Sequence, residues 1–289
     1  MHRQHGKKKD DPDPFPSHPL AGDVPAPRRQ EPPAETPASP LRILVIEDDR
    51  LSRVLLTEWL IQDGHRVLLP EPDQDPVTLV RSQEVDRILT DLHLPDRDGV
   101  ELIRTIRALP DPRKAGVPIL VVTAETRPEP LRAARSAGAD VVLCKPVERS
   151  MLRQALTPHP PLPVRHLRSE PQTSDTILNT GILEQGCRSL GTERFLSICQ
   201  IFCALEHETV QAMEQACQRS EAQTLAEIAH RLSGRAGHLG MESLAAQART
   251  LVNEARQMLP SECAERVRTL AAASQAAGQA LKQWMRQRV

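Results

Sequence analysis

The amino-acid sequence predicts an α/β domain with a doubly wound, five-stranded parallel sheet, followed by an all-α antiparallel four-helix bundle. Three observations support this. Short β-branched apolar runs alternate with helical patterns up to residue 157, helical patterns alone continue from residue 176, and two proline-rich stretches border the first of these regions. Strands and helices that alternate through connections too long for hairpins indicate parallel strands covered by helices on both faces.

Composition divides the chain of 289 residues into four segments. Residues 1–40 are rich in Pro, Asp, Lys, Arg and Glu and bury too little apolar surface to offset the entropy of ordering, so we expect a disordered tail. A second proline-rich stretch, 158–175, is typical of a semi-extended linker. The predicted domains are therefore 41–157 and 176–289.

The first domain contains five apolar runs of the kind found in strands that are buried on both faces. Each run is followed by a helical pattern, and the first helix is expected to end at Gly64, a favoured residue just beyond a helix C-terminus. The expected strands are LRILVI (41–46), HRVLLP (65–70), DRILTD (86–91), VPILVVT (117–123) and ADVVLC (139–144), and the expected helices cover 49–64, about 74–83, 99–109, about 125–136 and 147–156.

The second domain has apolar residues at helical spacing and no strand pattern. We expect about four main helices and a short leading one, packed as an antiparallel bundle. The apolar positions that predict these helices include Leu178, Ile182, Leu190, Phe195, Ile198, Phe202, Leu225, Ile228, Leu232, Leu244, Leu251, Val267, Leu270 and Leu281.

The overall composition argues against several classes of function. The formal net charge is −1 and the isoelectric point is about 6.8, so no global charge favours nucleic-acid or membrane binding. The longest apolar runs are far shorter than the roughly 18 residues of a bilayer span, and the N-terminus has no apolar signal region. We expect a soluble, cytoplasmic protein. Its six cysteines form no CxxC pair and are expected to be reduced, mostly buried thiols.

Chemically active residues follow four of the five predicted strands. Ligand sites of open parallel sheets lie at the carboxyl ends of the strands. Carboxylates that converge there would repel one another unless a cation lay between them, and an oxygen-rich set with an open side suits Mg²⁺. A metal ion, a hydroxyl and an ammonium group around one carboxylate form a phosphoryl-transfer site. The residues concerned are Glu47, Asp48 and Asp49 after the first strand, Asp91 at the end of the third, Thr123 at the end of the fourth and Lys145 after the fifth.

Each of these residues also has an ordinary structural role when it is taken alone. Acidic residues after strands commonly cap the next helix, and Asp49 is well placed to do so. Lys145 alone is typical of a surface lysine. Their joint occurrence at the strand ends favours the phosphoryl-transfer site.

The stretch LAEIAHRLSGRAGHLG, residues 225–240, contains a candidate reactive histidine. His230 lies two positions from both Ile228 and Leu232 of the apolar stripe, so it is expected to face solvent, away from the bundle core. Gly234 and Gly237 lie on nearly the same helix face, where each glycine costs roughly 0.5–1 kcal/mol relative to alanine. Close approach of another protein to this face would explain them.

Two further roles for His230 stay open. A metal site shared with His238 is disfavoured, because eight residues of helix separate the two by about 12 Å along the axis. A plain solvent-exposed histidine is the stronger alternative. His238 itself is expected to be a surface residue.

Residues 41–157 resemble the receiver domain of two-component response regulators, which has a flavodoxin-like fold. The resemblance implies that Asp91 is the phospho-acceptor, that Asp48 binds Mg²⁺ directly and Glu47 largely through water, and that the backbone carbonyl of His93 is a further ligand. It also implies that Thr123 and Lys145 hold phosphoryl oxygens. Val142 departs from the family, which usually has an aromatic residue there to couple phosphorylation to the output surface. The matching motifs are VIEDD (45–49), TDLHLPDRDG (90–99), VVTAE (121–125) and CKP (144–146).

The motif AHRLSGRAGHLG within a predicted bundle is similar to that of histidine phosphotransfer (HPt) domains, and residues 176–289 fit their length and helix order. The resemblance implies that His230 is the phosphorylated histidine and that Gly234 gives a partner receiver access to it. Ser233 departs from the family, which usually has Lys or Arg three residues after the histidine. Arg231 and Arg235 are the nearest cations, but neither is expected to point the same way as Ser233.

Together these resemblances imply a phosphorelay intermediate that depends on Mg²⁺. A sensor histidine kinase would phosphorylate Asp91, and His230 would pass the phosphoryl group to or from a separate response regulator receiver. We recognise no ATP-binding kinase domain, so we expect phosphate to come from another protein or a small phosphodonor, without conventional enzymatic turnover. No nucleic-acid partner is expected. Two alternatives stay open: a non-catalytic adaptor that responds to phosphorylation, and a phosphate sink for a kinase.

Overall fold

The computed structural model of the protein describes residues 40–95, 97–157, 177–255 and 257–288. Apart from Pro40, the tail predicted for 1–40 lies outside the described residues, as does the linker predicted for 158–175.

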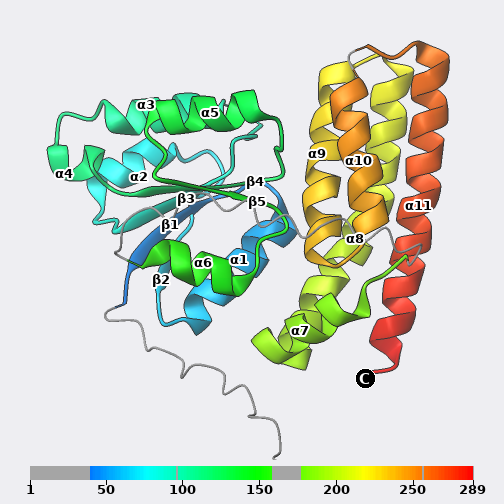
Figure 1. Cartoon of the computed structure of the whole chain (residues 1–289), viewed down its shortest axis with the longest axis horizontal. Helices are drawn as coiled ribbons and strands as arrows, with labels where there is room; N and C mark the ends of the chain where they lie inside the picture. Colours follow the sequence, from blue (N-terminus) through cyan, green and yellow to red (C-terminus); the bar gives the residue numbers. More distant parts are fainter. Residues whose placement is uncertain (1–39, 96, 158–176, 256, 289) are drawn as a thin grey trace, which may run out of the picture. The chain divides into compact units, whose positions relative to one another are not determined.

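Five parallel strands form one sheet in the order β2-β1-β3-β4-β5 (Figure 1). The strand order changes direction at β1, which pairs with β2 on one side and with β3 on the other, as in doubly wound sheets. This confirms the predicted fold class. The strands are β1 (Arg42–Ile46), β2 (Arg66–Leu68), β3 (Arg87–Thr90), β4 (Ile119–Thr123) and β5 (Val141–Cys144).

Helices cover both faces of the sheet, with α1 and α6 on one side and α2, α3 and α5 on the other (Figure 1). The side chains of β1 alternate between these faces: Ile43 and Val45 pack with α1 and α6, whereas Leu44 and Ile46 pack with α2 and α3. The helices are α1 (Arg50–Gln62), α2 (Pro76–Ser82), α3 (Gly99–Arg107), α4 (Pro112–Ala115), α5 (Pro128–Ala137) and α6 (Arg149–Leu156).

Local signals set the ends of the first helix. Asp49 is its N-cap, because the carboxylate accepts a hydrogen bond of 2.9 Å from the backbone N–H of Ser52. Gly64 follows the helix with a φ of 84°, which glycine adopts without strain. The sequence did not predict α4, since this single turn buries none of its residues and so has no apolar periodicity.

The second domain is helical, as predicted. Its short leading helix packs against α8, and α8 packs against α9 and α11, while α10 packs against α9 and α11 (Figure 1). The connections between α8, α9 and α10 are short, which places successive helices antiparallel. The helices are α7 (Thr180–Leu190), α8 (Thr192–Gln218), α9 (Ala222–His238), α10 (Glu242–Glu254) and α11 (Pro260–Arg286).

The two domains pack against each other through α1, which contacts α7, α8 and α9. The apolar cluster beneath α1 and α6 continues into the bundle core. Polar contacts add to this packing. Gln62 donates a hydrogen bond of 3.1 Å to the carbonyl of Leu190, and Arg149 donates one of 2.7 Å to the carbonyl of Ser189.

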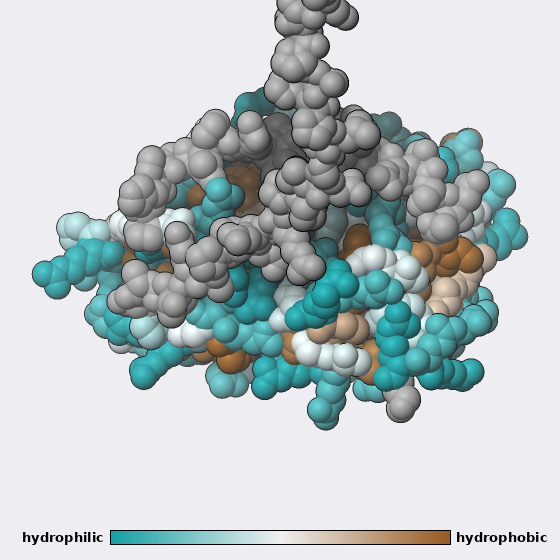
Figure 2. Space-filling model, turned by 60° about the horizontal axis from the view of Figure 1, so that its bottom comes forward, coloured by the Kyte–Doolittle hydropathy of each residue, from teal (hydrophilic) through white to brown (hydrophobic). Residues whose placement is uncertain are grey.

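The surface that one view shows is mixed in character. On the face shown in Figure 2, hydrophobic residues form small patches among hydrophilic ones. None of the helices in the described part of the chain has the length and apolarity needed to cross a bilayer. The six cysteines are free, but only Cys199 is fully buried, so the expectation of mostly buried thiols was wrong for the other five. Among these, Cys217 and Cys263 place their Sγ atoms 2.8 Å apart.

Candidate functional site

The strand register brings two of the predicted acidic residues together. β1 and β3 are aligned so that Ile46 pairs with Thr90. The residues that follow these strands, Glu47 and Asp91, therefore emerge side by side at the carboxyl end of the sheet. Both are buried, with exposed fractions of 6% and 2%.

Lys145 reaches the same point from β5. β4 and β5 pair Thr123 with Cys144, which places Lys145 directly beyond the buried Thr123. Its Nζ lies 2.8 Å from Oδ2 of Asp91 and 2.7 Å from Oε2 of Glu47. One ammonium group thus joins two carboxylates in a buried cluster.

Burial and charge together set the protonation of this cluster. Burial opposes ionisation of Asp91, but Lys145, His230 and the Thr123 hydroxyl hold its pKa below the usual value. Burial raises the pKa of Glu47 to about 8, against the attraction of Lys145. Burial also opposes the charge on Lys145, yet the two carboxylates raise its pKa. Asp91 is therefore the ionised carboxylate beside a charged lysine.

The other two acidic residues after β1 pair with arginines of α9. Asp48 Oδ2 lies 3.2 Å from Nη1 of Arg231, and Asp49 Oδ2 lies 3.1 Å from Nε of Arg235. Burial raises the pKa of Asp48, and Arg231 partly offsets this effect. Both arginines therefore reach the acidic end of the sheet, a pairing that the sequence did not predict.

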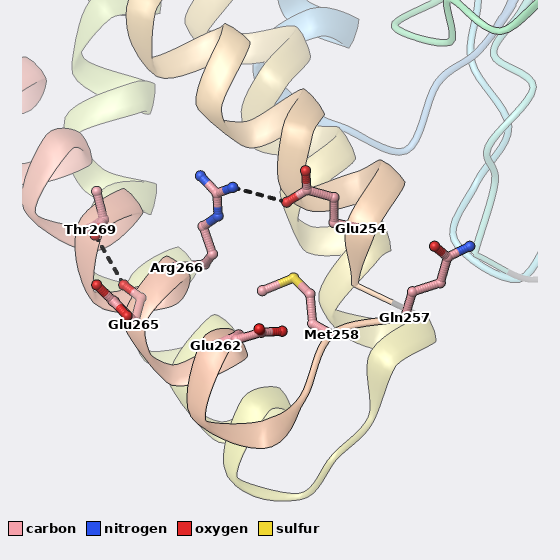
Figure 3. Close-up of a pocket in the computed structure, with 7 residues that line it drawn as sticks. All are labelled: Glu254, Gln257, Met258, Glu262, Glu265, Arg266 and Thr269. Carbon is pink, nitrogen blue, oxygen red and sulfur yellow. Dashed lines mark hydrogen bonds and ion pairs between the residues drawn. The ribbon is translucent and has the colours of Figure 1, made fainter.

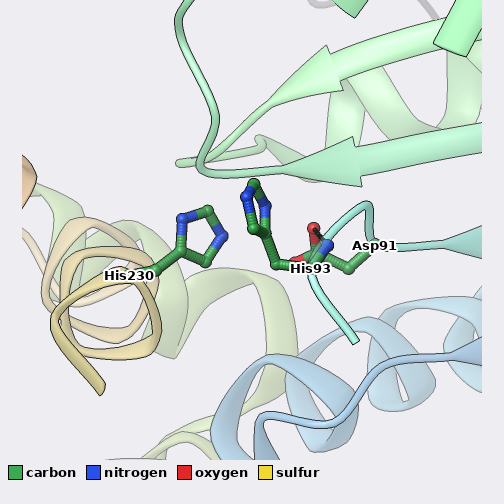
Figure 4. Close-up of side chains that lie close together, drawn as sticks. All are labelled: Asp91, His93 and His230. Carbon is green, nitrogen blue, oxygen red and sulfur yellow. Dashed lines mark hydrogen bonds between the residues drawn. The ribbon is translucent and has the colours of Figure 1, made fainter. Parts of the chain in front are cut away.

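His230 lies next to Asp91 (Figure 4). Asp91, His93 and His230 can each offer one ligand atom, and these atoms all lie within 4.8 Å of one another. The ring of His230 lies 4.1 Å from that of His93, centroid to centroid, and is tilted by 39° to it. Burial lowers the pKa of His230 to about 4, so its imidazole is neutral at physiological pH. The structure thus places the candidate histidine beside the candidate aspartate.

Two expectations about exposure were wrong. His230 and His238 were both predicted to face solvent, but each has an exposed fraction of only 6%. The position of His230 on the helix does turn it away from the apolar stripe of the bundle, as expected. The first domain, however, covers that face of the helix. His238 lies beside Trp59 of α1, with ring centroids 6.4 Å apart. Helical periodicity identifies the face opposite a bundle core but not what covers it.

The glycines of α9 lie where the first domain comes closest. A Cβ atom added to Gly234 would lie 3.4 Å from Cδ of Lys145, and one added to Gly237 would lie 3.4 Å from Cδ of Pro146. Close approach by another protein was the reason inferred for these glycines. Here the approaching receiver-like domain belongs to the same chain.

The two departures from the family patterns also have structural counterparts. Ser233 is buried, and the guanidinium of Arg249, from α10, donates a hydrogen bond of 3.5 Å to its hydroxyl. A cation from another helix therefore lies beside the position where the family usually carries one. Val142 is buried in the core on the α2, α3 and α5 face of the sheet.

Sequence reasoning missed the side chain of His93, which it considered only for its backbone carbonyl. The Nε2 atom of His93 lies 3.8 Å from a carboxylate oxygen of Glu125, which in turn binds Arg127. The only available signal was the position of His93, two residues after Asp91 in the loop beyond β3.

A separate pocket lies at the turn between α10 and α11 (Figure 3). It contains an ion pair between Arg266 and Glu254, 3.1 Å apart, and none of the residues described above. Its lining residues are Glu254, Gln257, Met258, Glu262, Glu265, Arg266 and Thr269.

Comparison with known proteins gives both domains a family. A family model described as "Response regulator receiver domain" matches residues 43–157, and one described as "Hpt domain" matches residues 197–280.

Several curated relatives match across both regions. The chain is 33% identical over 228 residues to the sensor histidine kinase AruS of Pseudomonas aeruginosa, covering 78% of this chain and 22% of the relative. It is 26% identical over 242 residues to the sensory/regulatory protein RpfC of Xanthomonas campestris, covering 80% of this chain and 32% of the relative. It is 28% identical over 274 residues to the virulence sensor protein BvgS of Bordetella pertussis, covering 88% and 22%. The chain thus spans between about a fifth and a third of the length of these relatives.

Solved structures match the first domain. The receiver domain of sensor histidine kinase PA1611 from Pseudomonas aeruginosa, with magnesium coordinated in its active site cleft, is 31% identical with a TM-score of 0.35, covering 40% of this chain and 93% of that one. The chemotaxis protein CheY4 of Vibrio cholerae is 24% identical with a TM-score of 0.37, covering 41% and 97%. From the two family matches, the chain carries a response regulator receiver domain followed by a histidine phosphotransfer (Hpt) domain.

Proposed function

We propose that the protein is a phosphorelay intermediate in which Asp91 accepts a phosphoryl group and exchanges it with His230. A receiver and an Hpt domain in one chain, with a relative named as a sensor histidine kinase, support a phosphorelay role. The observation that carries the finer proposal is the position of His230, buried beside Asp91 across the contact between the two domains.

Acceptance of the phosphoryl group would begin with attack by the ionised Asp91 carboxylate on a phosphohistidine of a sensor histidine kinase. A P–O bond forms to Asp91 as the P–N bond of the donor breaks. Lys145, at 2.8 Å, neutralises the attacking carboxylate and would then hold a phosphoryl oxygen, as would the Thr123 hydroxyl. Burial of the cluster strengthens these interactions, because little water screens them.

The oxygen-rich end of the sheet fits Mg²⁺. Glu47, Asp48 and Asp91 converge there as oxygen ligands, the type that Mg²⁺ prefers, and burial raises the pKa of Glu47 because a buried carboxylate is costly to ionise without a cation. We propose that these three residues and the backbone carbonyl of His93 hold the ion. When bound, Mg²⁺ would neutralise charge on the phosphoryl oxygens during transfer.

Transfer onto His230 requires a neutral imidazole with an available lone pair. Burial keeps the pKa of His230 near 4, and within the described residues its Nε2 has no hydrogen-bond partner. Attack by this nitrogen on the phosphorus of phospho-Asp91 forms a P–N bond, breaks the P–O bond and releases the Asp91 carboxylate beside Lys145. A separate response regulator receiver would then exchange phosphate with His230 once the chain's own receiver has moved aside.

The test is transfer from a radiolabelled phosphorylated kinase in the presence of Mg²⁺. We expect Asp91→Asn to abolish labelling, and His230→Gln to accumulate alkali-labile aspartyl phosphate without alkali-stable phosphohistidine. If His230→Gln passes phosphate to a partner receiver at the wild-type rate, the relay proposal is wrong and the chain is a phosphorylation-dependent adaptor. If phosphate on Asp91 of the wild type hydrolyses without reaching His230 or a partner, it is a phosphate sink.

A further inference from the structure

We propose a second metal site, in which His230, His93 and Asp91 bind a transition-metal ion of the Zn²⁺ class across the contact between the receiver and Hpt domains. It differs from the Mg²⁺ site in its ligands, since two of the three are imidazole nitrogens. Imidazoles combined with a carboxylate suit Zn²⁺, Co²⁺, Ni²⁺ and Cu²⁺, whereas Mg²⁺ prefers oxygen ligands alone.

The geometry of the three side chains is the first argument. Their ligand atoms lie within 4.8 Å of one another, and Figure 4 shows the two rings and the carboxylate gathered between α9 and the loop after β3. Metal–nitrogen bonds of about 2.0–2.1 Å place tetrahedral ligand atoms about 3.3 Å apart. Side-chain adjustments of about 1.5 Å or less would therefore close the site, without movement of either domain.

Two unpaired nitrogen atoms provide a second, independent argument. Nε2 of His230 and Nδ1 of His93 are buried, and neither has a hydrogen-bond partner among the described residues. A buried polar atom without a partner is costly, and such atoms generally have a ligand, an ion or a water as a partner. One metal ion would satisfy both nitrogens.

The surroundings of His93 provide a third argument for the metal site. Its Nε2 faces the carboxylate of Glu125 at 3.8 Å, and Arg127 holds that carboxylate in place with a contact of 2.6 Å. This separation is too long for a hydrogen bond, but the negative charge favours the tautomer with the proton on Nε2, which leaves the other nitrogen free for a metal. For His93 the free nitrogen would be Nδ1.

Asp91 completes the ligand set but also limits its affinity. Its Oδ1 accepts backbone hydrogen bonds from Leu92 and His93, and its Oδ2 binds Lys145, so the ion would share an already engaged carboxylate. Each carboxylate oxygen can accept a further interaction. The ammonium of Lys145 repels a divalent ion, so we expect weaker binding than at a structural zinc site.

The consequence rests on the proposed phosphorelay function. An ion bound to both Asp91 and His230 occupies the carboxylate that attacks phosphorus and the nitrogen that receives it. It also links the two domains. Zinc-class ions would therefore inhibit transfer by holding the receiver against the Hpt domain.

Binding is tested with the metal-free full chain carrying Cys217→Ser and Cys263→Ser, since those adjacent thiols are another potential zinc ligand pair. We expect one Zn²⁺ per chain by calorimetry, and a visible Co²⁺ ligand-field spectrum without thiolate charge-transfer bands. His93→Asn should weaken binding at least tenfold. His207→Asn, at an exposed histidine of α8, is the matched control and should bind as the parent does. Equal binding by the His93→Asn variant would overturn the proposal.

A second experiment tests the effect on function. For each variant, the rate of phosphoryl transfer from Asp91 to His230 is compared with and without Zn²⁺, at a constant Mg²⁺ concentration. We expect strong inhibition of the parent and of His207→Asn, and a much smaller fractional inhibition of His93→Asn. Equal inhibition of all three would reject the inhibitory site. If the parent shows no transfer in the absence of zinc, the phosphorelay function fails instead, while the Co²⁺ spectrum still reports on the metal site.

Discussion

At the scale of the residue, His230 combines two properties that a free surface histidine lacks. It is buried, so its imidazole stays neutral, and it lies against a carboxylate that is ionised because Lys145 accompanies it. Both properties come from side chains more than 80 residues away in sequence. The helix supplies only the direction in which His230 points, together with the small residues that allow the receiver to approach.

Gly234 allows a direct test of that approach. We expect Gly234→Ala to stabilise the Hpt domain by roughly 0.5–1 kcal/mol through helix propensity, with transfer close to wild type, because its Cβ lies at an ordinary contact distance of 3.4 Å from Lys145. Gly234→Leu should keep the helix but slow transfer by at least tenfold, since its longer side chain meets Lys145. Thermal unfolding and phosphotransfer rates measure the two effects. Wild-type transfer by Gly234→Leu would contradict the docked arrangement.

At the scale of the element, α9 is the contact helix of the Hpt domain. It bears His230, the two glycines and the two arginines that pair with the acidic residues after β1. The pair of Arg235 and Asp49 is the more deeply buried, since each side chain has an exposed fraction of 6%. Breaking a buried ion pair by removing one partner leaves an uncompensated charge, which is costly.

A double-mutant cycle should detect this coupling. Arg235→Met alone is expected to lower the free energy of unfolding by about 3 kcal/mol. Asp49→Asn alone should cost less, because asparagine also caps helices well. In the double variant the two losses should not add, with a coupling of about 1–3 kcal/mol measured by urea unfolding. Additive losses would show that the ion pair does not hold α9 against the sheet.

The elements also show how far the sequence could predict the structure. The strands and the long helices were predicted because each has an apolar stripe of the correct period, which depends only on neighbouring residues. α4 was missed because it has no such stripe. The acidic cluster could be inferred because the carboxyl ends of parallel strands meet at one edge. The contact of Arg231 with Asp48 could not, since it depends on how two separate domains dock.

At the scale of the whole molecule, docking buries His238 in neutral form. Burial lowers its pKa to about 3, with a smaller contribution from Lys145, against 6.5 for an exposed histidine. The undocked state therefore binds more protons between these values. The stabilisation of the docked state is fully present above about pH 6.5 and is lost as the pH falls.

Acidification should therefore separate the two domains. Between pH 6.5 and pH 5 the docked state should lose up to about 2 kcal/mol from His238. The fluorescence of Trp59, which lies beside His238, would report the change in a Trp284→Phe background. His238→Leu should reduce the pH dependence, because leucine does not titrate. If the wild type and His238→Leu show the same pH dependence, the dependence comes from other titrating groups.

Docking within one chain also determines which copy of His230 receives the phosphoryl group. Because both domains belong to one chain, they meet at an effective concentration that is typically millimolar for linked modules, far above the micromolar concentration of the protein in an assay. Transfer from Asp91 to His230 in the wild type should therefore be independent of protein concentration. A mixture of Asp91→Asn and His230→Gln, in which transfer must occur between chains, should be slower by about a hundredfold or more at micromolar concentration. In each acceptor chain, the receiver domain of that same chain already covers His230. This slows exchange between chains further. Full recovery of the wild-type rate in the mixture would show that the chains transfer phosphate between copies.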